Sequence, residues 1–308
     1  MKVIDYEAEY DNRSRVPEHP QIVEAWARDA AAFRRTAEME ADIAYGPSAR
    51  HRLDMFFPSP DHRPERLVMF IHGGYWRFFD KSYFSHLARG CLAAGLTVAM
   101  PSYSLLPAVR INDVIEDMRL ACRFLAHRHG PPITVSGHSA GGHLAAAVLA
   151  TGWGADGPRI NAAQLISGLF DLLPLLETPH NAELRFGPAE ARAASPLFWT
   201  PPVGKTAHLW VGSQQSSEFK RQSERLALTW GDAGVDTRCD EVPDANHFTA
   251  AAPLTDPHSD LTRDLVTLAR SGYALHPARS DRACSRRPHL ITSRSTGAHA
   301  SKRLRRHA

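Results

Sequence analysis

Short runs of apolar residues alternate with helical patterns through most of this chain. Residues 67–71 and 96–100 are continuously apolar, as expected for strands buried on both faces. Residues 111–127 instead carry apolar residues at helical spacing. Further strands are expected at 131–136, 162–167, 207–211 and 236–242, and further helices at 82–94, 143–150, 218–233 and 259–269. The alternation predicts an α/β fold with a mostly parallel sheet that helices cover on both faces.

An amphipathic helix is predicted before the first of these strands. Over residues 18–42, apolar residues recur at helical spacing with charged residues between them. No linker is visible inside residues 46–270. We therefore predict one domain over residues 1–275, in which residues 1–45 form an arm that packs against the rest.

The end of the chain differs in composition. Residues 276–308 carry nine Lys+Arg and one acidic residue, whereas the remainder carries 27 basic and 32 acidic residues. The body is therefore mildly acidic and gives no electrostatic reason to expect a nucleic-acid partner. We predict that residues 276–308 are a disordered basic tail, because no aromatic residue interleaves with the charges. A polyanion-binding arm is the alternative.

The sequence carries no evident targeting or metal-binding signal. Its longest apolar stretches fall far short of the roughly 20 residues that a membrane-spanning helix needs. The charged N-terminal residues contain no secretory h-region. The four cysteines are scattered, and no pair has metal-ligand spacing. These patterns predict a cytoplasmic protein with no membrane partner, no metal and no cofactor.

The pentapeptide Gly137-His-Ser-Ala-Gly141 lies between a predicted strand and an alanine-rich helix. G-x-S-x-G in that context is typical of a nucleophile elbow. The strand must turn sharply into the helix, and the two glycines leave room for that turn. Ser139 is then presented above the sheet at a helix N-terminus, where developing negative charge is favoured. A tight strand–helix turn without catalysis is the alternative.

A second glycine motif, His72-Gly-Gly-Tyr-Trp76, directly follows the strand expected at 67–71. H-G-G at this place matches the oxyanion-hole loop of many esterases. Two glycines let the backbone approach a substrate carbonyl, so Gly73 and Gly74 are expected to offer N–H groups to its oxygen. The N–H of Ala140 completes this set of donors. A Gly-Gly turn followed by aromatic core residues is the alternative.

A general base must take the proton of Ser139. The chain has 17 histidines, so position decides between them. In this arrangement the chain order is nucleophile, acid, base. His247 follows the last predicted strand, in Asp244-Ala-Asn-His-Phe248, where the base is expected. His258 is the nearest competitor, but it precedes the closing helix and is predicted to lie on the surface.

Together these segments resemble the α/β-hydrolase serine hydrolases of the kynurenine formamidase (arylformamidase) group, which are related to the hormone-sensitive-lipase-like esterases. The matching segments are residues 9–13, 16–20, 72–76, 137–142, 167–172, 217–223 and 246–248. The resemblance implies an α/β-hydrolase fold, with Ser139 as nucleophile and His247 as general base. It also implies that Tyr75 and Trp76 line a pocket for an aromatic substrate, with the arm covering the site.

One position departs from that group. Its members usually carry Asp or Glu shortly after the strand expected here at 207–211, and this chain has Gln215. A carboxylate at that place orients the histidine and stabilises the imidazolium that forms. Gln215 can accept a hydrogen bond from His247 and fix its tautomer, but it supplies no charge. Either Gln215 is a neutral orienter, or Glu218 or Asp244 takes the place of the acid.

The resemblance implies hydrolysis of a small aryl formamide or ester, with N-formylkynurenine as the favoured substrate. A promiscuous short-chain carboxylesterase, or an amidase for another N-acyl aromatic compound, is the alternative among hydrolases. Gln215 also points to a different class, a degenerate hydrolase-like binding protein, although Ser139 and His247 are intact. The oligomeric state stays open, with a homodimer as one option.

Overall fold

The computed structural model describes residues 4–59, 66–130 and 132–271. All of them belong to the unit Met1–Leu275, one of two units into which the chain divides. The predicted basic tail, residues 276–308, lies outside the described residues. The architecture below is that of the first unit.

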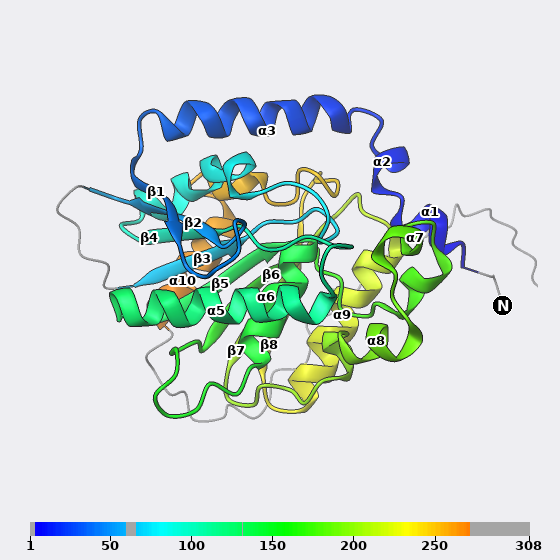
Figure 1. Cartoon of the computed structure of the whole chain (residues 1–308). Helices are drawn as coiled ribbons and strands as arrows, with labels where there is room; N and C mark the ends of the chain where they lie inside the picture. Colours follow the sequence, from blue (N-terminus) through cyan, green and yellow to red (C-terminus); the bar gives the residue numbers. More distant parts are fainter. Residues whose placement is uncertain (1–3, 60–65, 131, 272–308) are drawn as a thin grey trace, which may run out of the picture. The chain divides into compact units, whose positions relative to one another are not determined.

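An eight-stranded sheet forms its centre, in the order β1-β2-β4-β3-β5-β6-β7-β8 (Figure 1). The strands are β1 (Glu38–Ala44), β2 (Arg52–Phe57), β3 (Leu67–Ile71), β4 (Thr97–Pro101), β5 (Ile133–His138), β6 (Ala162–Ile166), β7 (Thr206–Gly212) and β8 (Asp236–Val242). Strand β2 is antiparallel to both of its neighbours, and β3 to β8 pair in parallel. The predicted α/β-hydrolase architecture with a mostly parallel sheet is therefore confirmed.

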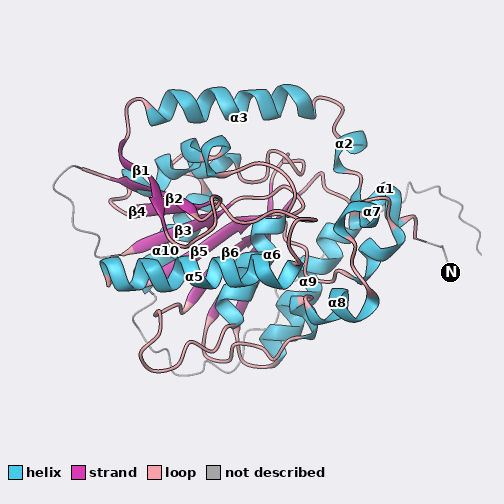
Figure 2. Cartoon of the chain, in the orientation of Figure 1, coloured by secondary structure: helices cyan, strands magenta, loops and turns pink. Residues whose placement is uncertain are grey.

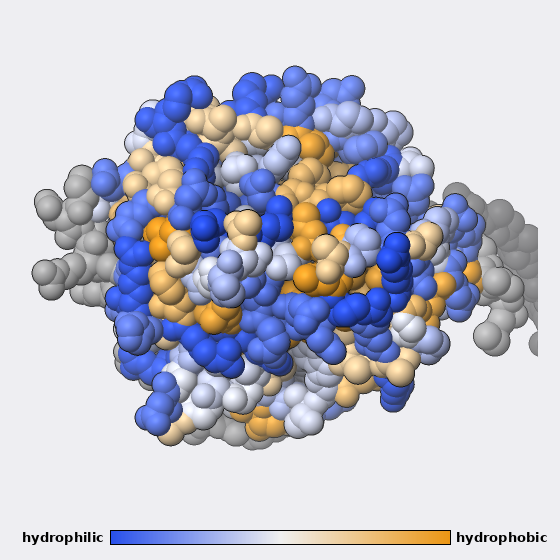
Figure 3. All heavy atoms as spheres, viewed as in Figure 1, coloured by the Kyte–Doolittle hydropathy of each residue, from blue (hydrophilic) through white to orange (hydrophobic). Residues whose placement is uncertain are grey.

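Helices lie on both sides of this sheet (Figure 2). They are α1 (Tyr6–Tyr10), α2 (Asn12–Arg15), α3 (His19–Arg34), α4 (Arg89–Ala93), α5 (Ile111–His129), α6 (Ala140–Ala150), α7 (Asn181–Leu184), α8 (Pro188–Ala193), α9 (Ser217–Asp232) and α10 (Asp260–Ser271). Helices α5, α6 and α9 share one hydrophobic core, and α3, α4 and α10 share another. In the view of Figure 3, hydrophilic residues cover much of the visible surface, with hydrophobic patches between them.

The position of strand β3 between two hydrophobic cores explains why its sequence is continuously apolar. Leu67, Met69 and Ile71 belong to the core of α5, α6 and α9, whereas Val68 and Phe70 belong to the core of α4 and α10. Successive side chains of a strand point to opposite faces. All five are buried, so both faces of the strand require apolar residues.

The prediction of one helix over residues 18–42 is wrong in its last third. Helix α3 ends at Arg34, and β1 begins at Glu38 and pairs with β2. The sequence analysis recognised neither strand. Strand β1 is the edge of the sheet and most of its residues are exposed, so its charged residues fit a solvent-facing helix equally well. Residues 38–44 form a strand and not a helix because their backbone pairs with β2.

Residues 82–94 also differ from the single helix predicted. Two 3₁₀ turns, Lys81–Tyr83 and Ser85–Ala88, precede the short helix α4. These turns bring the ring of Phe84 to 5.6 Å from the ring of His72. Packing against the glycine loop thus outweighs local helix propensity. The other predicted strands and helices are present, with ends shifted by a few residues.

Two features are absent from the described residues. None of the helices in this part of the chain is long and apolar enough to cross a membrane. Among the same residues, no group of three or more His, Cys, Asp or Glu side chains is arranged to hold a metal ion.

Candidate active site

Ser139 occupies the sharp turn between β5 and α6. Its backbone has φ 57° and ψ −122°, in the left-handed region that a residue with a side chain rarely adopts. The flanking glycines allow this turn. A Cβ on Gly137 would overlap the carbonyl oxygen of Gly141, and a Cβ on Gly141 would overlap that of Ile71. The strain is held in place by the strand and the helix on either side.

His247 contacts Ser139 directly. Its Nε2 lies 3.0 Å from Ser139 Oγ, although the two residues are 108 positions apart in the sequence. The amide of Ser139 donates to the carbonyl of Ile166 at 2.9 Å, which ties the elbow to β6. Ser139 is 2 % exposed and His247 is 7 % exposed. A hydroxyl and an imidazole at this distance can exchange a proton.

The surroundings of His247 keep its imidazole neutral. His138 Nε2 donates to the backbone carbonyl of His247 at 2.8 Å, and the ring of Phe219 lies 4.6 Å from the ring of His247. Burial, with a smaller contribution from His138, holds the pKa of His247 well below 6.5. Burial also lowers the pKa of His138 to about 4. A neutral ring leaves a nitrogen free to accept a proton.

The glycine loop after β3 is anchored through its carbonyl groups. Tyr103 Oη donates to the carbonyl of His72 at 2.9 Å, and His72 Nδ1 donates to the carbonyl of Gly73 at 2.8 Å. In a trans peptide the C=O and N–H groups point in opposite directions. Fixing these two carbonyls therefore fixes the amides of Gly73 and Gly74. Within the described residues, neither amide donates to a protein acceptor.

This loop lies against the elbow. A Cβ on Gly73 would stand 2.9 Å from the carbonyl oxygen of His138 and 3.0 Å from Ser139 Cβ. Gly74 has φ 111°, which requires glycine. Ala140 is the first residue of α6, so its amide has no acceptor within the helix. The amide of Gly73 therefore belongs to a residue packed against Ser139, the amide of Gly74 follows it along the loop, and the amide of Ala140 directly follows Ser139.

Gln215 is buried beside the elbow. Its Nε2 donates to Ser167 Oγ at 2.6 Å, while its Oε1 has no hydrogen-bond partner. His247 Nδ1 is likewise buried without a partner. Gln215 Oε1 is therefore an acceptor without a donor, and His247 Nδ1 is a nitrogen without a partner. The two atoms do not hydrogen-bond to each other in this structure.

The two acidic alternatives lie elsewhere. Glu218 accepts from Tyr10 Oη at 3.0 Å and from both Nε and Nη2 of Arg221, at 2.6 and 2.7 Å. Asp244 is exposed in the loop before His247. Neither carboxylate hydrogen-bonds to His247, because Glu218 already has partners and Asp244 faces solvent.

The two aromatic residues after the glycine loop have different surroundings. Trp76 is fully buried in the core, where its ring meets that of His143 edge-on at 5.1 Å. Tyr75 stacks on His180 at 4.4 Å and donates its hydroxyl to the carbonyl of Tyr10 at 2.8 Å. The structure thus places Trp76 in the core and Tyr75 under the arm.

The N-terminal arm packs on both sides of the Ser139–His247 pair. From α1, Glu9 accepts from the amide of Glu218 at 2.9 Å, near the N-terminus of α9. From α3, His19 stacks on Phe248 at 5.4 Å, and Trp26 lies 6.0 Å from the same ring. Phe248 is the neighbour of His247. The arm therefore helps to enclose the site, in keeping with the low exposure of Ser139.

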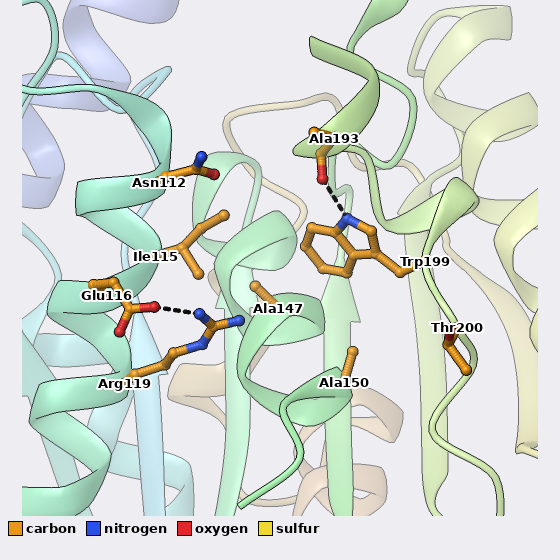
Figure 4. Close-up of a pocket in the computed structure, with 9 residues that line it drawn as sticks. All are labelled: Asn112, Ile115, Glu116, Arg119, Ala147, Ala150, Ala193, Trp199 and Thr200. Carbon is orange, nitrogen blue, oxygen red and sulfur yellow. Dashed lines mark hydrogen bonds and ion pairs between the residues drawn. The ribbon is translucent and has the colours of Figure 1, made fainter. Parts of the chain in front are cut away.

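A cavity of about 480 Å³ lies between α5, α6 and the segment 193–200 (Figure 4). Arg119 turns toward Glu116 in it, and Trp199 Nε1 donates to the carbonyl of Ala193 at 2.6 Å. None of its lining residues belongs to the predicted site. The chemistry of Ser139 is therefore separate from this cavity.

Two residues that hold the site together were not predicted from the sequence. Tyr103 fixes the glycine loop through its hydroxyl, and Ser167 binds the amide of Gln215. Ser167 opens the segment 167–172, directly after β6 and beside the elbow. A serine at the carboxyl end of a central parallel strand was the available signal, because ligands and catalytic groups gather at that edge of such sheets.

Comparison with known proteins agrees with this geometry. A family described as the α/β hydrolase fold matches residues 68–188. The chain is 30 % identical to the kynurenine formamidase of Danio rerio over 244 residues, which cover 76 % of this chain and 83 % of that protein. It is 29 % identical to the kynurenine formamidase of Salmo salar over 245 residues, with the same coverage. The crystal structure of a candidate thioesterase from Silicibacter sp. TM1040 has 34 % identity and a TM-score of 0.76, covering 87 % of this chain and all of that one.

The fold and the Ser139–His247 pair define an α/β hydrolase. The chain belongs to the family of α/β hydrolases that contains the kynurenine formamidases, and the protein is a hydrolase.

Proposed function

We propose that this hydrolase cleaves a small aryl formamide or ester through Ser139, and that N-formylkynurenine, hydrolysed to kynurenine and formate, is its substrate. The 3.0 Å contact between His247 Nε2 and Ser139 Oγ carries the proposal. The likeness to kynurenine formamidases supports the choice of substrate. A nucleophile that is only 2 % exposed also favours a small acyl group, and formyl is the smallest.

The reaction follows from the positions of the groups. Ser139 Oγ attacks the formyl carbon while His247 Nε2 takes the hydroxyl proton. The amides of Gly73, Gly74 and Ala140 donate to the oxyanion. The C–N bond then breaks, and His247 passes its proton to the departing aromatic amine. Water, deprotonated by His247, attacks the formyl ester on Ser139. The bond to Ser139 Oγ then breaks, His247 returns the proton to that oxygen, and formate is released.

Gln215 is the residue of this chain at the position of the acid. In the proposed mechanism its Oε1 accepts Nδ1–H of His247 and holds the tautomer in which Nε2 is free to act as base. It contributes no negative charge to stabilise the imidazolium. We therefore expect catalysis slower than that of an otherwise equal site with a carboxylate.

A short-chain carboxylesterase, or an amidase for another N-acyl aromatic compound, is the second candidate. The neutral Gln215 favours the carboxylesterase within this candidate, because an activated ester demands less of the general base than an amide does. The likeness to a candidate thioesterase points the same way. In either case we propose a small aromatic amide or ester as the substrate and Tyr75, beside the glycine loop, as a contact for it.

The deciding experiment measures hydrolysis of N-formylkynurenine by the purified protein, with Ser139→Ala as the blank and p-nitrophenyl acetate as a parallel substrate. Deformylation that depends on Ser139 supports the formamidase. Ester cleavage without deformylation moves the protein to the second candidate. If neither substrate is cleaved and a fluorophosphonate fails to label Ser139, the proposed chemistry is wrong.

A further inference from the structure

Ser167 is a buried serine in a conformation that serines seldom adopt. It is fully buried, has φ 50°, and directly follows β6. Its amide donates to the carbonyl of Trp210 at 2.7 Å, which fixes its backbone between β6 and β7. The preceding residue, Ile166, accepts from the amide of Ser139. Ser167 is therefore held rigidly next to the nucleophile, yet the mechanism above gives it no role.

The hydroxyl of Ser167 binds only one end of the Gln215 amide. Gln215 Nε2 donates to Ser167 Oγ at 2.6 Å, and Oε1 of the same amide is left without a partner. The loop that carries His247 is joined to the turn that carries Gln215. The backbone N–H of Gln214 donates to the carbonyl of Ala245 at 3.0 Å. His247 Nδ1 is the unpaired nitrogen on that loop. Gln215 Oε1, an acceptor, and His247 Nδ1, which can donate, are thus both buried without partners. Leaving two such atoms unpaired costs free energy unless they hydrogen-bond to each other.

An amide at this position raises a problem that a carboxylate does not. The two oxygens of a carboxylate are equivalent, so either can accept Nδ1–H. An amide has one acceptor and one donor. With Oε1 toward His247, the ring carries its proton on Nδ1, and Nε2 can accept from Ser139. With Nε2 toward His247, the ring must carry its proton on the nitrogen that faces Ser139, and it cannot act as a base.

We propose that Ser167 is a positioning residue that selects the working orientation of Gln215. By accepting from Gln215 Nε2, Ser167 Oγ turns Oε1 toward His247 Nδ1 and so fixes the Nδ1–H tautomer. The Ser167–Gln215 pair thereby supplies by orientation part of what an acid supplies by charge. This inference rests on the proposed role of Ser139 and His247, and it concerns the tautomer of the base whatever the substrate.

The test is a double-mutant cycle that compares Ser167→Ala in the natural Gln215 background and in the Gln215→Glu background. The readout is the rate at which a fluorophosphonate labels Ser139, because labelling needs the same base but no particular substrate. We expect Ser167→Ala to slow labelling roughly 10- to 100-fold beside Gln215 and by less than about threefold beside Glu, since a carboxylate needs no orientation. Equal losses in the two backgrounds would show a merely structural role and overturn the proposal.

Ser136→Ala is the matched control. Ser136, on β5, is also fully buried, and its hydroxyl donates to the side-chain oxygen of Gln164, on β6, at 3.3 Å. Its loss should slow labelling equally in both backgrounds or not at all. If Ser167→Ala does not fold, Ser167→Gly replaces it, because glycine accepts the positive φ and also lacks the hydroxyl.

A spectroscopic measurement gives an independent answer. The ¹⁵N shifts of the His247 ring report which nitrogen carries the proton. We expect Nδ1–H in the natural protein and a shift toward Nε2–H in Ser167→Ala. An unchanged tautomer in that variant would overturn the proposal. Complete absence of labelling in the natural protein would instead refute the proposed nucleophile, so the two failures are distinguishable.

Discussion

The hydroxyl of Tyr10 donates to Glu218 Oε2 at 3.0 Å and joins two residues that are 208 positions apart. Tyr10 belongs to the arm, and Glu218 lies in the first turn of α9. Arg221 holds the same carboxylate from the other side. A carboxylate that the sequence analysis considered for the catalytic acid thus serves to attach the arm.

We predict that Glu218→Gln lowers the free energy of unfolding by about 1–3 kcal/mol. The change removes the carboxylate that contacts Arg221 at 2.6 Å and leaves that guanidinium only Asp171, at 3.7 Å. The acid limb of the pH–rate profile should not move, since Glu218 does not bind His247. Chemical denaturation and a pH series of kcat/KM measure the two effects. Glu224→Gln, on the exposed side of the same helix, is the control. A limb that shifts only in Glu218→Gln would restore Glu218 as the acid.

Tyr103→Phe is expected to lower kcat about 10-fold or more with less effect on KM. The variant releases the carbonyl of His72, so the amides of Gly73 and Gly74 lose part of their fixed direction. Steady-state kinetics on the better substrate measures the change. Tyr83→Phe is the control, because Tyr83 packs through its ring on Phe79 and Phe84 and its hydroxyl has no hydrogen bond among the described residues. Equal effects of the two variants would contradict the role of Tyr103.

The pH–rate profile should show an acid limb below pH 6.5. Burial keeps the pKa of His247 well under that value, so the base stays unprotonated in mildly acidic solution. Gln215→Glu places a negative charge at the acid position, which favours the imidazolium. We expect the limb to move up by ~1 pH unit or more.

Gln214→Glu adds the same charge at the neighbouring exposed position and should leave the limb where it is. A limb that stays in place in Gln215→Glu would mean that residue 215 does not face His247. That result would remove Gln215 from the proposed mechanism.

Stability should fall as the pH drops from about 6.5 to 4. Burial lowers the pKa of His72, His138 and His143 to about 4. Between the two values the unfolded chain binds more protons than the native protein, so the free energy of unfolding decreases with falling pH. Each histidine contributes roughly 1.4 kcal/mol per pH unit in this range. Urea denaturation at several pH values measures the slope.

His143→Gln should reduce the pH dependence of the free energy of unfolding by the contribution of one histidine, roughly 1.4 kcal/mol per pH unit. Its amide can still donate to the carbonyl of Ala194, which His143 Nε2 contacts at 2.7 Å, but it does not titrate. His258→Gln, at an exposed position, should change nothing. A stability that is flat between pH 6.5 and 5 would contradict the burial argument.

Most of the sheet could be predicted from sequence because its central strands are buried on both faces. Strand β3 is a continuous apolar run for that reason. The elbow after β5 has glycines at the positions where backbone segments approach too closely to leave room for a Cβ. Strands β1 and β2, at one end of the sheet, could not be predicted in the same way. Strand β1 is mostly exposed, and β2 includes the buried charge Asp54, which pairs with Lys81 and Arg34. Such partners are distant in sequence and leave no local pattern.

The sequence by itself determined the elbow at Ser139 and the glycine loop at Gly73 and Gly74, because the sharp turns and close backbone approaches there require glycine at those positions. The place of His247 after the last strand also pointed to it as the histidine that reaches Ser139, and the structure puts the two in contact. Only the tertiary structure decided that Glu218 belongs to the arm and that Ser167 binds Gln215. These contacts join the ends of different strands. They exist because the strand order brings loops from distant parts of the chain to one edge of the sheet, and no local pattern encodes that order.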